Sequence, residues 1–120
     1  MTDAVHDETE STEAEVHAFI KDTIEEHPVV LFMKGVPDQP QCGFSAVVVQ
    51  ILDHLGANFV GVNILQDEVL RAGVKTYSDW PTIPQLYVAG EFIGGSDIVR
   101  EMFESGELKS LLAEKGVVRA

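Results

Sequence analysis

The spacing of apolar residues along the chain predicts five helices and four strands. Apolar residues recur every three or four positions in five stretches, and these predict helices over residues 12–27, 42–56, 67–77, 96–104 and 108–112. Short apolar runs between them predict strands over residues 29–33, 59–64, 85–88 and 91–93. The elements therefore follow the order α-β-α-β-α-β-β-α-α.

This order predicts an α/β fold in which one small mixed sheet of four strands is covered by helices on both faces. The first two strands and the helix between them form a βαβ unit, whose right-handed crossover makes the strands parallel. Only Ala89-Gly90 separates the last two strands, which predicts a tight hairpin. Before residue 42, Gly35, Pro37 and Pro40 predict a loop without regular structure.

Composition and charge narrow the class of protein. The 120 residues suit one domain, and we expect a flexible acidic lead-in over residues 1–10 and a folded domain over residues 11–120. The net charge of −12 argues against nucleic acid or an anionic membrane as a partner, and no apolar run is long enough to span a membrane. No Lys or Arg precedes Lys21, whereas targeting segments are basic, and a single cysteine suits a reducing compartment. We therefore expect a cytoplasmic location.

The single cysteine, Cys42, is the main candidate for chemistry. It follows a Gly/Pro loop and stands where an amphipathic helix begins, so backbone N–H groups and the positive end of the helix dipole favour its thiolate. A thiolate is both a nucleophile and a metal ligand. A free cysteine can also be a small buried apolar residue. Its neighbours Pro40, Gln41, Gly43 and Ser45 are not core residue types, which favours the reactive or ligating interpretation.

Few basic residues lie in the central part of this acidic chain. Between Pro28 and Val99 they are Lys34, Arg71 and Lys75. Lys34 follows the first strand, on the cysteine loop, and the other two are four residues apart, so they would share one helix face. These cations either form a local site for a small anion near the thiolate or solvate a helix surface, and charge alone leaves both open.

Four motifs follow one another along the chain. They are Cys42-Gly43-Phe44-Ser45, Trp80-Pro81-Thr82-Ile83-Pro84-Gln85-Leu86, Gly90-Glu91-Phe92-Ile93-Gly94-Gly95-Ser96-Asp97, and Glu101-Met102 with Ser105-Gly106-Glu107-Leu108. In this order and spacing they resemble the monothiol glutaredoxins of the CGFS type. The resemblance runs from about residue 16 to residue 112, and it implies a thioredoxin-like fold.

The resemblance implies a groove that binds glutathione at its two charged ends. Lys34 would meet the glycine carboxylate, with Arg71 nearby. Ser96 and Asp97 stand at the start of a helix and would bind the γ-glutamyl end. The backbone N–H groups there suit its carboxylate, and the Asp97 side chain suits its ammonium.

The middle of glutathione would meet the turn before the third strand. Ile83 precedes Pro84, whose peptide bond is cis in this fold and leaves the preceding backbone free to pair with the ligand. We expect Trp80 to pack rather than to touch the ligand. Gly94 and Gly95 would serve close backbone approach or a positive φ.

The resemblance also implies a 2Fe–2S cluster shared between two copies. Such a cluster is held by four thiolates, and each chain supplies only Cys42. One glutathione beside each Cys42 would complete the set, so the cluster would bridge a homodimer with two glutathiones. Many relatives have a second cysteine where this chain has Ser96, and its absence removes any internal disulfide. The four histidines show no paired spacing typical of a metal site, and we expect them at the surface.

These expectations lead to three candidate functions. The favoured one is an iron–sulfur carrier that stores cluster, passes it to apo-proteins, works with a BolA-type partner and serves iron and redox homeostasis. The second is a glutathione-dependent thiol–disulfide oxidoreductase in which Cys42 is the nucleophile. The third is an adaptor without redox chemistry. The lack of a second thiol in the motif and the long loop over residues 35–41 favour the carrier.

Overall fold

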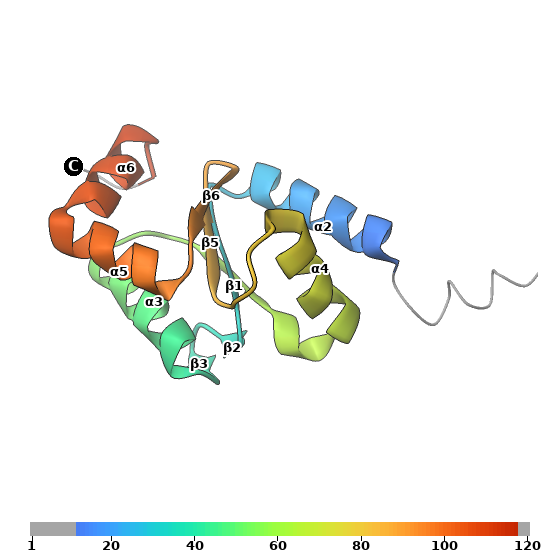
Figure 1. Cartoon of the computed structure of the whole chain (residues 1–120). Helices are drawn as coiled ribbons and strands as arrows, with labels where there is room; N and C mark the ends of the chain where they lie inside the picture. The colour runs from blue at the N-terminus through green and yellow to red at the C-terminus, as the bar shows by residue number, and fades with distance from the viewer. Residues whose placement is uncertain (1–11, 118–120) are drawn as a thin grey trace, which may run out of the picture.

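The computed structural model describes residues 12–117, so the predicted lead-in over residues 1–10 lies outside the described residues (Figure 1). The helices are α2 (Glu13–Glu26), α3 (Gly43–His54), α4 (Glu68–Ser78), α5 (Ser96–Ser105) and α6 (Glu107–Glu114), with a 3-10 turn η1 (Ile64–Gln66) before α4. The strands are β1 (Val29–Met33), β2 (Gly35–Val36), β3 (Gln39–Pro40), β4 (Val60–Asn63), β5 (Gln85–Val88) and β6 (Glu91–Gly94). Across the part of the chain described, no helix has the length and apolar character that crossing a bilayer requires.

One four-stranded mixed sheet lies at the centre of the fold. Its strand order is β4-β1-β5-β6, with β1 parallel to β4 and antiparallel to β5, and β5 antiparallel to β6. The parallel pair confirms the predicted βαβ unit, which crosses over through α3. The β5–β6 hairpin turns at Ala89 and Gly90, both with positive φ. The predicted thioredoxin-like α/β fold is therefore confirmed.

Strand β1 is buried on both faces and divides the core in two. Val29, Leu31 and Met33 pack against residues of α3, α5 and α6. Val30 and Phe32 point the other way, into the core beneath α2 and α4. Figure 1 shows the two groups of helices on opposite sides of the sheet. A strand buried on both faces must be apolar throughout, which is why β1 contains no polar residue.

An aromatic cluster extends from the core beneath α2 and α4 toward the loop before β5. Ring centroids lie 5.8 Å apart for Phe32 and Tyr87, 5.5 Å for Tyr87 and Phe92, and 5.8 Å for Phe92 and Trp80. Burial raises the pKa of Tyr87 to about 12, and the nearby Tyr77 adds to the shift. Trp80 packs on this cluster although its side chain stays partly exposed, in agreement with the packing role expected for it.

The segment before Cys42 is a small hairpin, so the prediction of a loop without regular structure was wrong. Strands β2 and β3 pair in antiparallel fashion, with Gly35 opposite Pro40. Gly35 has a φ of +90°, and its N–H donates a hydrogen bond to Asn63 Oδ1 at 3.0 Å. The hairpin is therefore tied to the end of β4. A proline is tolerated in so short a strand because an edge strand does not need every backbone donor.

Helix α5 begins after a glycine. Its N-cap is Gly95, and no side chain caps the first turn. The preceding Gly94 has a φ of +149°, and a Cβ there would lie 2.8 Å from the Cβ of Ile98. Only glycine fits this position, as its expected role in positive φ or close approach requires.

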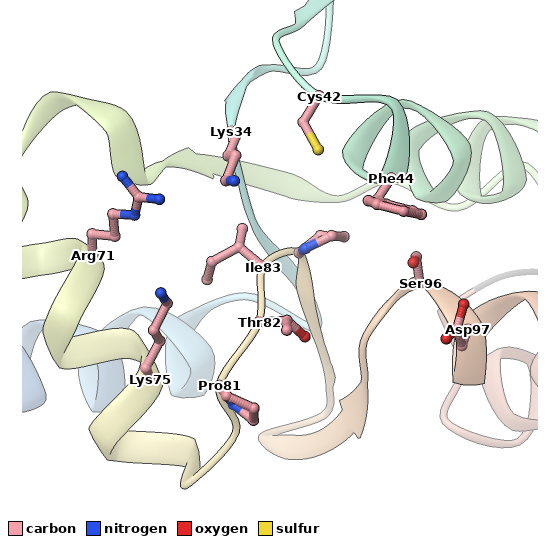
Figure 2. Close-up of a pocket in the computed structure, with 11 residues that line it drawn as sticks. Lys34, Cys42, Phe44, Arg71, Lys75, Pro81, Thr82, Ile83, Ser96 and Asp97 are labelled. Atoms are coloured by element: carbon pink, nitrogen blue, oxygen red, sulfur yellow. The ribbon is translucent and has the colours of Figure 1, made fainter.

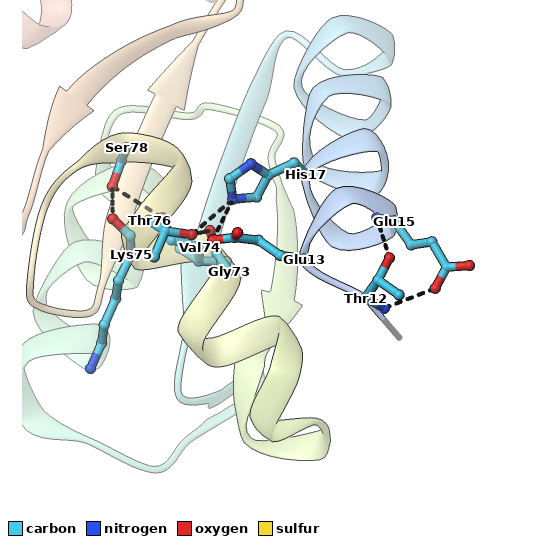
Figure 3. Close-up of polar contacts among 9 residues, drawn as sticks. All are labelled: Thr12, Glu13, Glu15, His17, Gly73, Val74, Lys75, Thr76 and Ser78. Carbon is cyan, nitrogen blue, oxygen red and sulfur yellow. Dashed lines mark hydrogen bonds and ion pairs between the residues drawn. The ribbon is translucent and has the colours of Figure 1, made fainter. Parts of the chain in front are cut away.

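Helices α2 and α4 come into close contact at Gly73, next to the hydrogen bond between His17 of α2 and Thr76 of α4 (Figure 3). A Cβ at this position would overlap Cγ1 of Val16, a buried residue of α2. Gly73 is itself buried in the middle of α4, where glycine is a poor helix former. The close contact between the helices therefore explains why a glycine stands there.

We expect Gly73→Ala to lower the free energy of unfolding by about 1–3 kcal/mol, because the overlap with Val16 outweighs the better helix propensity of alanine. Urea denaturation would measure this. Gly43→Ala is the matched control, since a Cβ at Gly43 meets no atom within 4 Å and the change should stay within about 0.5 kcal/mol. In the Val16→Ala background the cost of Gly73→Ala should shrink. A Gly73→Ala variant as stable as the unchanged chain would contradict the packing argument.

Candidate functional site

A pocket of about 440 Å³ opens beside the end of β1 (Figure 2). Five elements or segments contribute to its lining: the residue after β1, the start of α3, two turns of α4, the loop before β5 and the start of α5. The residues predicted for the site all lie there, namely Lys34, Cys42, Arg71, Ile83, Ser96 and Asp97. The fold thus brings together residues from distant parts of the chain. Their contacts with a ligand remain predictions.

Cys42 stands at the N-cap of α3, half-buried, and Figure 2 shows its sulfur pointing toward the pocket. The backbone N–H of Ser45 is the largest cause that holds the pKa of the Cys42 thiol below its usual value. The N–H of Phe44 and the charge of Lys34 act in the same direction, while burial opposes them. Because the sulfur makes no capping hydrogen bond of ordinary geometry, the N–H groups act on it mainly through their dipoles. The thiolate is therefore favoured.

A buried serine joins the start of α3 to the end of β1. Ser45 is fully buried, and its Oγ accepts a hydrogen bond from the backbone N–H of Lys34 at 3.1 Å. The Lys34 carbonyl accepts a second bond from the Gln41 N–H at 2.9 Å. These two bonds hold Lys34 beside the thiol. The view of Ser45 as a residue outside the core was wrong, because its hydroxyl satisfies a backbone donor inside the fold.

Three basic side chains surround one end of the pocket. Lys34 follows β1, and Arg71 and Lys75 come from successive turns of α4. Figure 2 shows the latter two reaching toward the cavity from the same side of the helix. Among residues 12–117 none of the three forms an ion pair, so their charge is available to an anion. Of the two alternatives left open by charge alone, this geometry favours the anion site.

The start of α5 forms the opposite side of the pocket. Ser96 and Asp97 are its first two residues, and Figure 2 places them across the cavity from the basic side chains. The first turn of a helix carries unpaired N–H groups that attract a carboxylate. The Asp97 side chain adds a negative charge that attracts an ammonium group. The basic end of the pocket therefore suits an anion, whereas this end suits a group that carries both a carboxylate and an ammonium.

The loop before β5 lies between these two ends. The Ile83–Pro84 peptide is cis, as the resemblance implies. Ile83 is only 7% exposed, yet within residues 12–117 neither its backbone N–H nor its carbonyl has a hydrogen-bond partner. Backbone groups at buried positions are normally paired in folded proteins. Ile83 therefore offers one donor and one acceptor to the backbone of an extended ligand.

Sequence reasoning left five lining residues out of the predicted site. They are Phe44, Lys75, Pro81, Thr82 and Pro84. The spacing of four residues between Arg71 and Lys75 was the signal that could have added Lys75. Phe44 fits the apolar spacing of its helix, and that spacing is misleading here: its side chain is 63% exposed and forms part of the pocket wall.

The chain alone offers few ligands for a metal. Within the described residues no group of three or more His, Cys, Asp or Glu side chains could hold a metal ion. Of the histidines, His54 is exposed, His17 and His27 are half-buried, and His6 lies outside the described residues. A metal bound through Cys42 would therefore need further ligands that do not come from residues 12–117.

Comparison with known proteins points to one family. A family model described as Glutaredoxin matches residues 29–93. Monothiol glutaredoxin-5, mitochondrial, of Saccharomyces cerevisiae is 52% identical over 103 residues, which cover 83% of this chain and 69% of that protein. The solution structure of reduced poplar apo GrxS14 shares 52% identity, with a TM-score of 0.76 and coverage of 85% of this chain and 94% of that one. The crystal structure of the buckwheat glutaredoxin–glutathione complex shares 25% identity, with a TM-score of 0.79 and coverage of 88% and 94%.

We expect the rate at which iodoacetamide alkylates Cys42 to rise with pH around a midpoint below that of the glutathione thiol measured in parallel. Lys34→Met should move this midpoint upward, because removing a nearby cation disfavours the thiolate. Lys109→Met, an exposed change on α6, is the control and should leave it in place. A midpoint at or above that of free glutathione would show that the helix start does not favour the thiolate.

Proposed function

The chain belongs to the monothiol glutaredoxins, and on that premise we propose that it binds glutathione and carries a 2Fe–2S cluster between two copies of itself. The observation that carries this proposal is the arrangement of the pocket. Positive charge stands at one end and a helix start with a carboxylate at the other. Between them lie the backbone donor and acceptor of Ile83, which have no partner within residues 12–117, and one thiol stands at the rim. Glutathione has matching groups in the same order.

Glutathione would lie along the loop before β5. Its glycine carboxylate would meet Lys34 and Arg71, with Lys75 close enough to add to the positive field. Its backbone would pair with the N–H and carbonyl of Ile83. Its γ-glutamyl end would meet the start of α5, where Asp97 faces the ammonium group. In this orientation the cysteine sulfur of glutathione comes beside the protein thiol.

The donor set of the pocket fits a shared 2Fe–2S cluster as cargo. Such a cluster takes four thiolates, and this chain supplies only Cys42. Two chains and two bound glutathiones provide the set. Cys42 is half-buried at the rim with its thiolate favoured, which leaves the sulfur accessible to a ligand shared with a second copy. The protein residues orient glutathione and hold the thiolate, and the cluster is what the dimer stores and passes on.

The remaining parts of the proposal concern partners and place. Acceptor apo-proteins would receive the cluster, and a BolA-type protein would replace one copy of the chain in a mixed dimer, which links the protein to iron and redox homeostasis. We propose a cytoplasmic location because a single cysteine suits a reducing compartment. The yeast relative is named as a mitochondrial protein, so fractionation of the source cell decides this point.

The lowered pKa of Cys42 also suits a second function, the reduction of glutathione mixed disulfides. The Cys42 thiolate would attack the glutathione sulfur of the mixed disulfide, and the substrate would leave as a thiolate. A second glutathione would then attack the Cys42–glutathione disulfide, which releases oxidised glutathione and restores the thiolate. The same pocket would serve both reactions, so experiment must separate them.

We expect anaerobic reconstitution with iron, sulfide and glutathione to give a 2Fe–2S absorption spectrum on a dimer, which bleaches when glutathione is removed. Cys42→Ser should remain folded by circular dichroism and lose the visible absorption completely, because it removes two of the four thiolates in the dimer. Size exclusion would follow the mass. A monomer without absorption that reduces a glutathionylated peptide would instead support the oxidoreductase, and a coloured Cys42→Ser variant would remove Cys42 from the ligands.

Lys34→Glu should weaken glutathione binding by about tenfold or more, because it places a carboxylate against the glycine carboxylate. The reconstituted cluster should be lost faster in proportion. Isothermal titration with glutathione and the decay of visible absorption measure the two effects. Lys109→Glu makes the same charge change on the exposed surface of α6 and serves as the control. Equal binding by the two variants would make Lys34 a bystander.

A further inference from the structure

The loop from Trp80 to Pro84 has little regular structure of its own to hold it. It joins α4 to β5, contains two prolines and lacks helix or strand geometry. The Trp80 N–H donates to the Lys75 carbonyl at 3.1 Å, which ties the start of the loop to the end of α4. Within residues 12–117 the other hydrogen bonds made by the loop backbone come from one side chain, that of Gln85.

Gln85 is fully buried and donates two hydrogen bonds to this loop. Its Nε2 lies 3.1 Å from the Trp80 carbonyl oxygen and 3.0 Å from the Thr82 carbonyl oxygen. Both neighbours accept and cannot donate, so the amide can face them only through its nitrogen. The other amide atom, Oε1, is buried and has no partner within residues 12–117.

The position of Gln85 makes it a firm anchor. It is the first residue of β5 and pairs with Phe32 of β1, the central strand that is buried on both faces. The two carbonyls that it holds lie on either side of Pro81, and the next residue along the chain is Ile83. Gln85 therefore links the sheet to the segment that contains Ile83, a residue that lines the pocket.

We propose that Gln85 is a positioning residue for glutathione: its amide holds the loop so that the Ile83 N–H and carbonyl are in place before the ligand arrives. This inference rests on the proposed glutathione site. A loop fixed in advance loses less conformational freedom on binding, so affinity rises without any contact between Gln85 and the ligand. Gln85 does not line the pocket, in agreement with an indirect role.

Gln85 Oε1, which has no partner within residues 12–117, indicates that this glutamine is not there only to stabilise the fold. A buried acceptor without a partner destabilises the folded state, whereas an apolar side chain of the same length would fill the space without that cost. Methionine has this length and shape. Replacing Gln85 by methionine removes the two hydrogen bonds to the loop and also removes the unpaired acceptor, so the two effects on stability partly offset each other while the loop loses its anchor.

The test compares Gln85→Met with Val88→Ala. Val88 lies on the same strand and is fully buried in the core beneath α3, α5 and α6. Within residues 12–117 it forms no hydrogen bond with the loop, and it does not line the pocket. Its truncation therefore destabilises the fold without changing the pocket directly. We expect Gln85→Met to raise the Kd for glutathione by about tenfold while its midpoint of thermal unfolding stays above that of Val88→Ala. Val88→Ala should bind glutathione like the unchanged chain.

Two ligand-free measurements test the loop itself. In Gln85→Met, the NMR order parameters of the Thr82 and Ile83 N–H groups should fall and the emission of Trp80, the single tryptophan, should shift. A Kd within twofold of the unchanged chain, or an equal loss of affinity in Val88→Ala, would overturn the inference. If the unchanged chain binds no glutathione, the proposed function fails and so does any role of Gln85 in glutathione affinity, while the order parameters show independently whether Gln85 holds the loop.

Discussion

The complete burial of β1 is the constraint on which the rest of the structure depends. Its side chains alternate between two cores, so helices must cover both faces of the sheet. Its end then fixes the site, because the backbone of Lys34 is held by the buried hydroxyl of Ser45 at the start of α3. The same strand pairs with β5, which begins at Gln85. The backbone of Lys34, the start of α3 with Cys42, and the loop before β5 are therefore all positioned by contacts with one buried strand.

The electrostatics of the pocket contrast with those of the whole chain. The net charge is −12, yet three basic side chains stand around one end of a single cavity. Their field is local, since salt screens charges beyond about 10 Å. A small anion that reaches the rim therefore meets attraction that the surrounding surface does not offer. The carboxylate of Asp97 on the far side gives the cavity a direction, so a ligand with opposite charges at its ends enters in one orientation.

Local patterns in the sequence were sufficient for the helices, the four main strands and the place of the thiol, because each depends on apolar spacing or on a turn. They failed where a contact with a residue far along the chain determines the local structure. The β2–β3 hairpin is held by Asn63, far along the chain, and Ser45 is buried because the Lys34 backbone needs an acceptor. Phe44 follows the helical period and still faces outward. Gln85 stands in a recognised motif, but only coordinates reveal which carbonyls its amide holds.

The lone thiol at the rim determines how Cys42 responds to oxidation. A sulfenic acid formed at Cys42 finds no second thiol in its own chain, because the sequence contains one cysteine and serine stands at position 96. Further oxidation to the sulfinic and sulfonic acids is then opposed only by a thiol from outside, which caps the sulfur as a reversible mixed disulfide. A pocket that concentrates glutathione beside Cys42 would therefore also shield it from irreversible damage. Glutathione held in the pocket would thus be both a ligand and the thiol that protects the Cys42 sulfur.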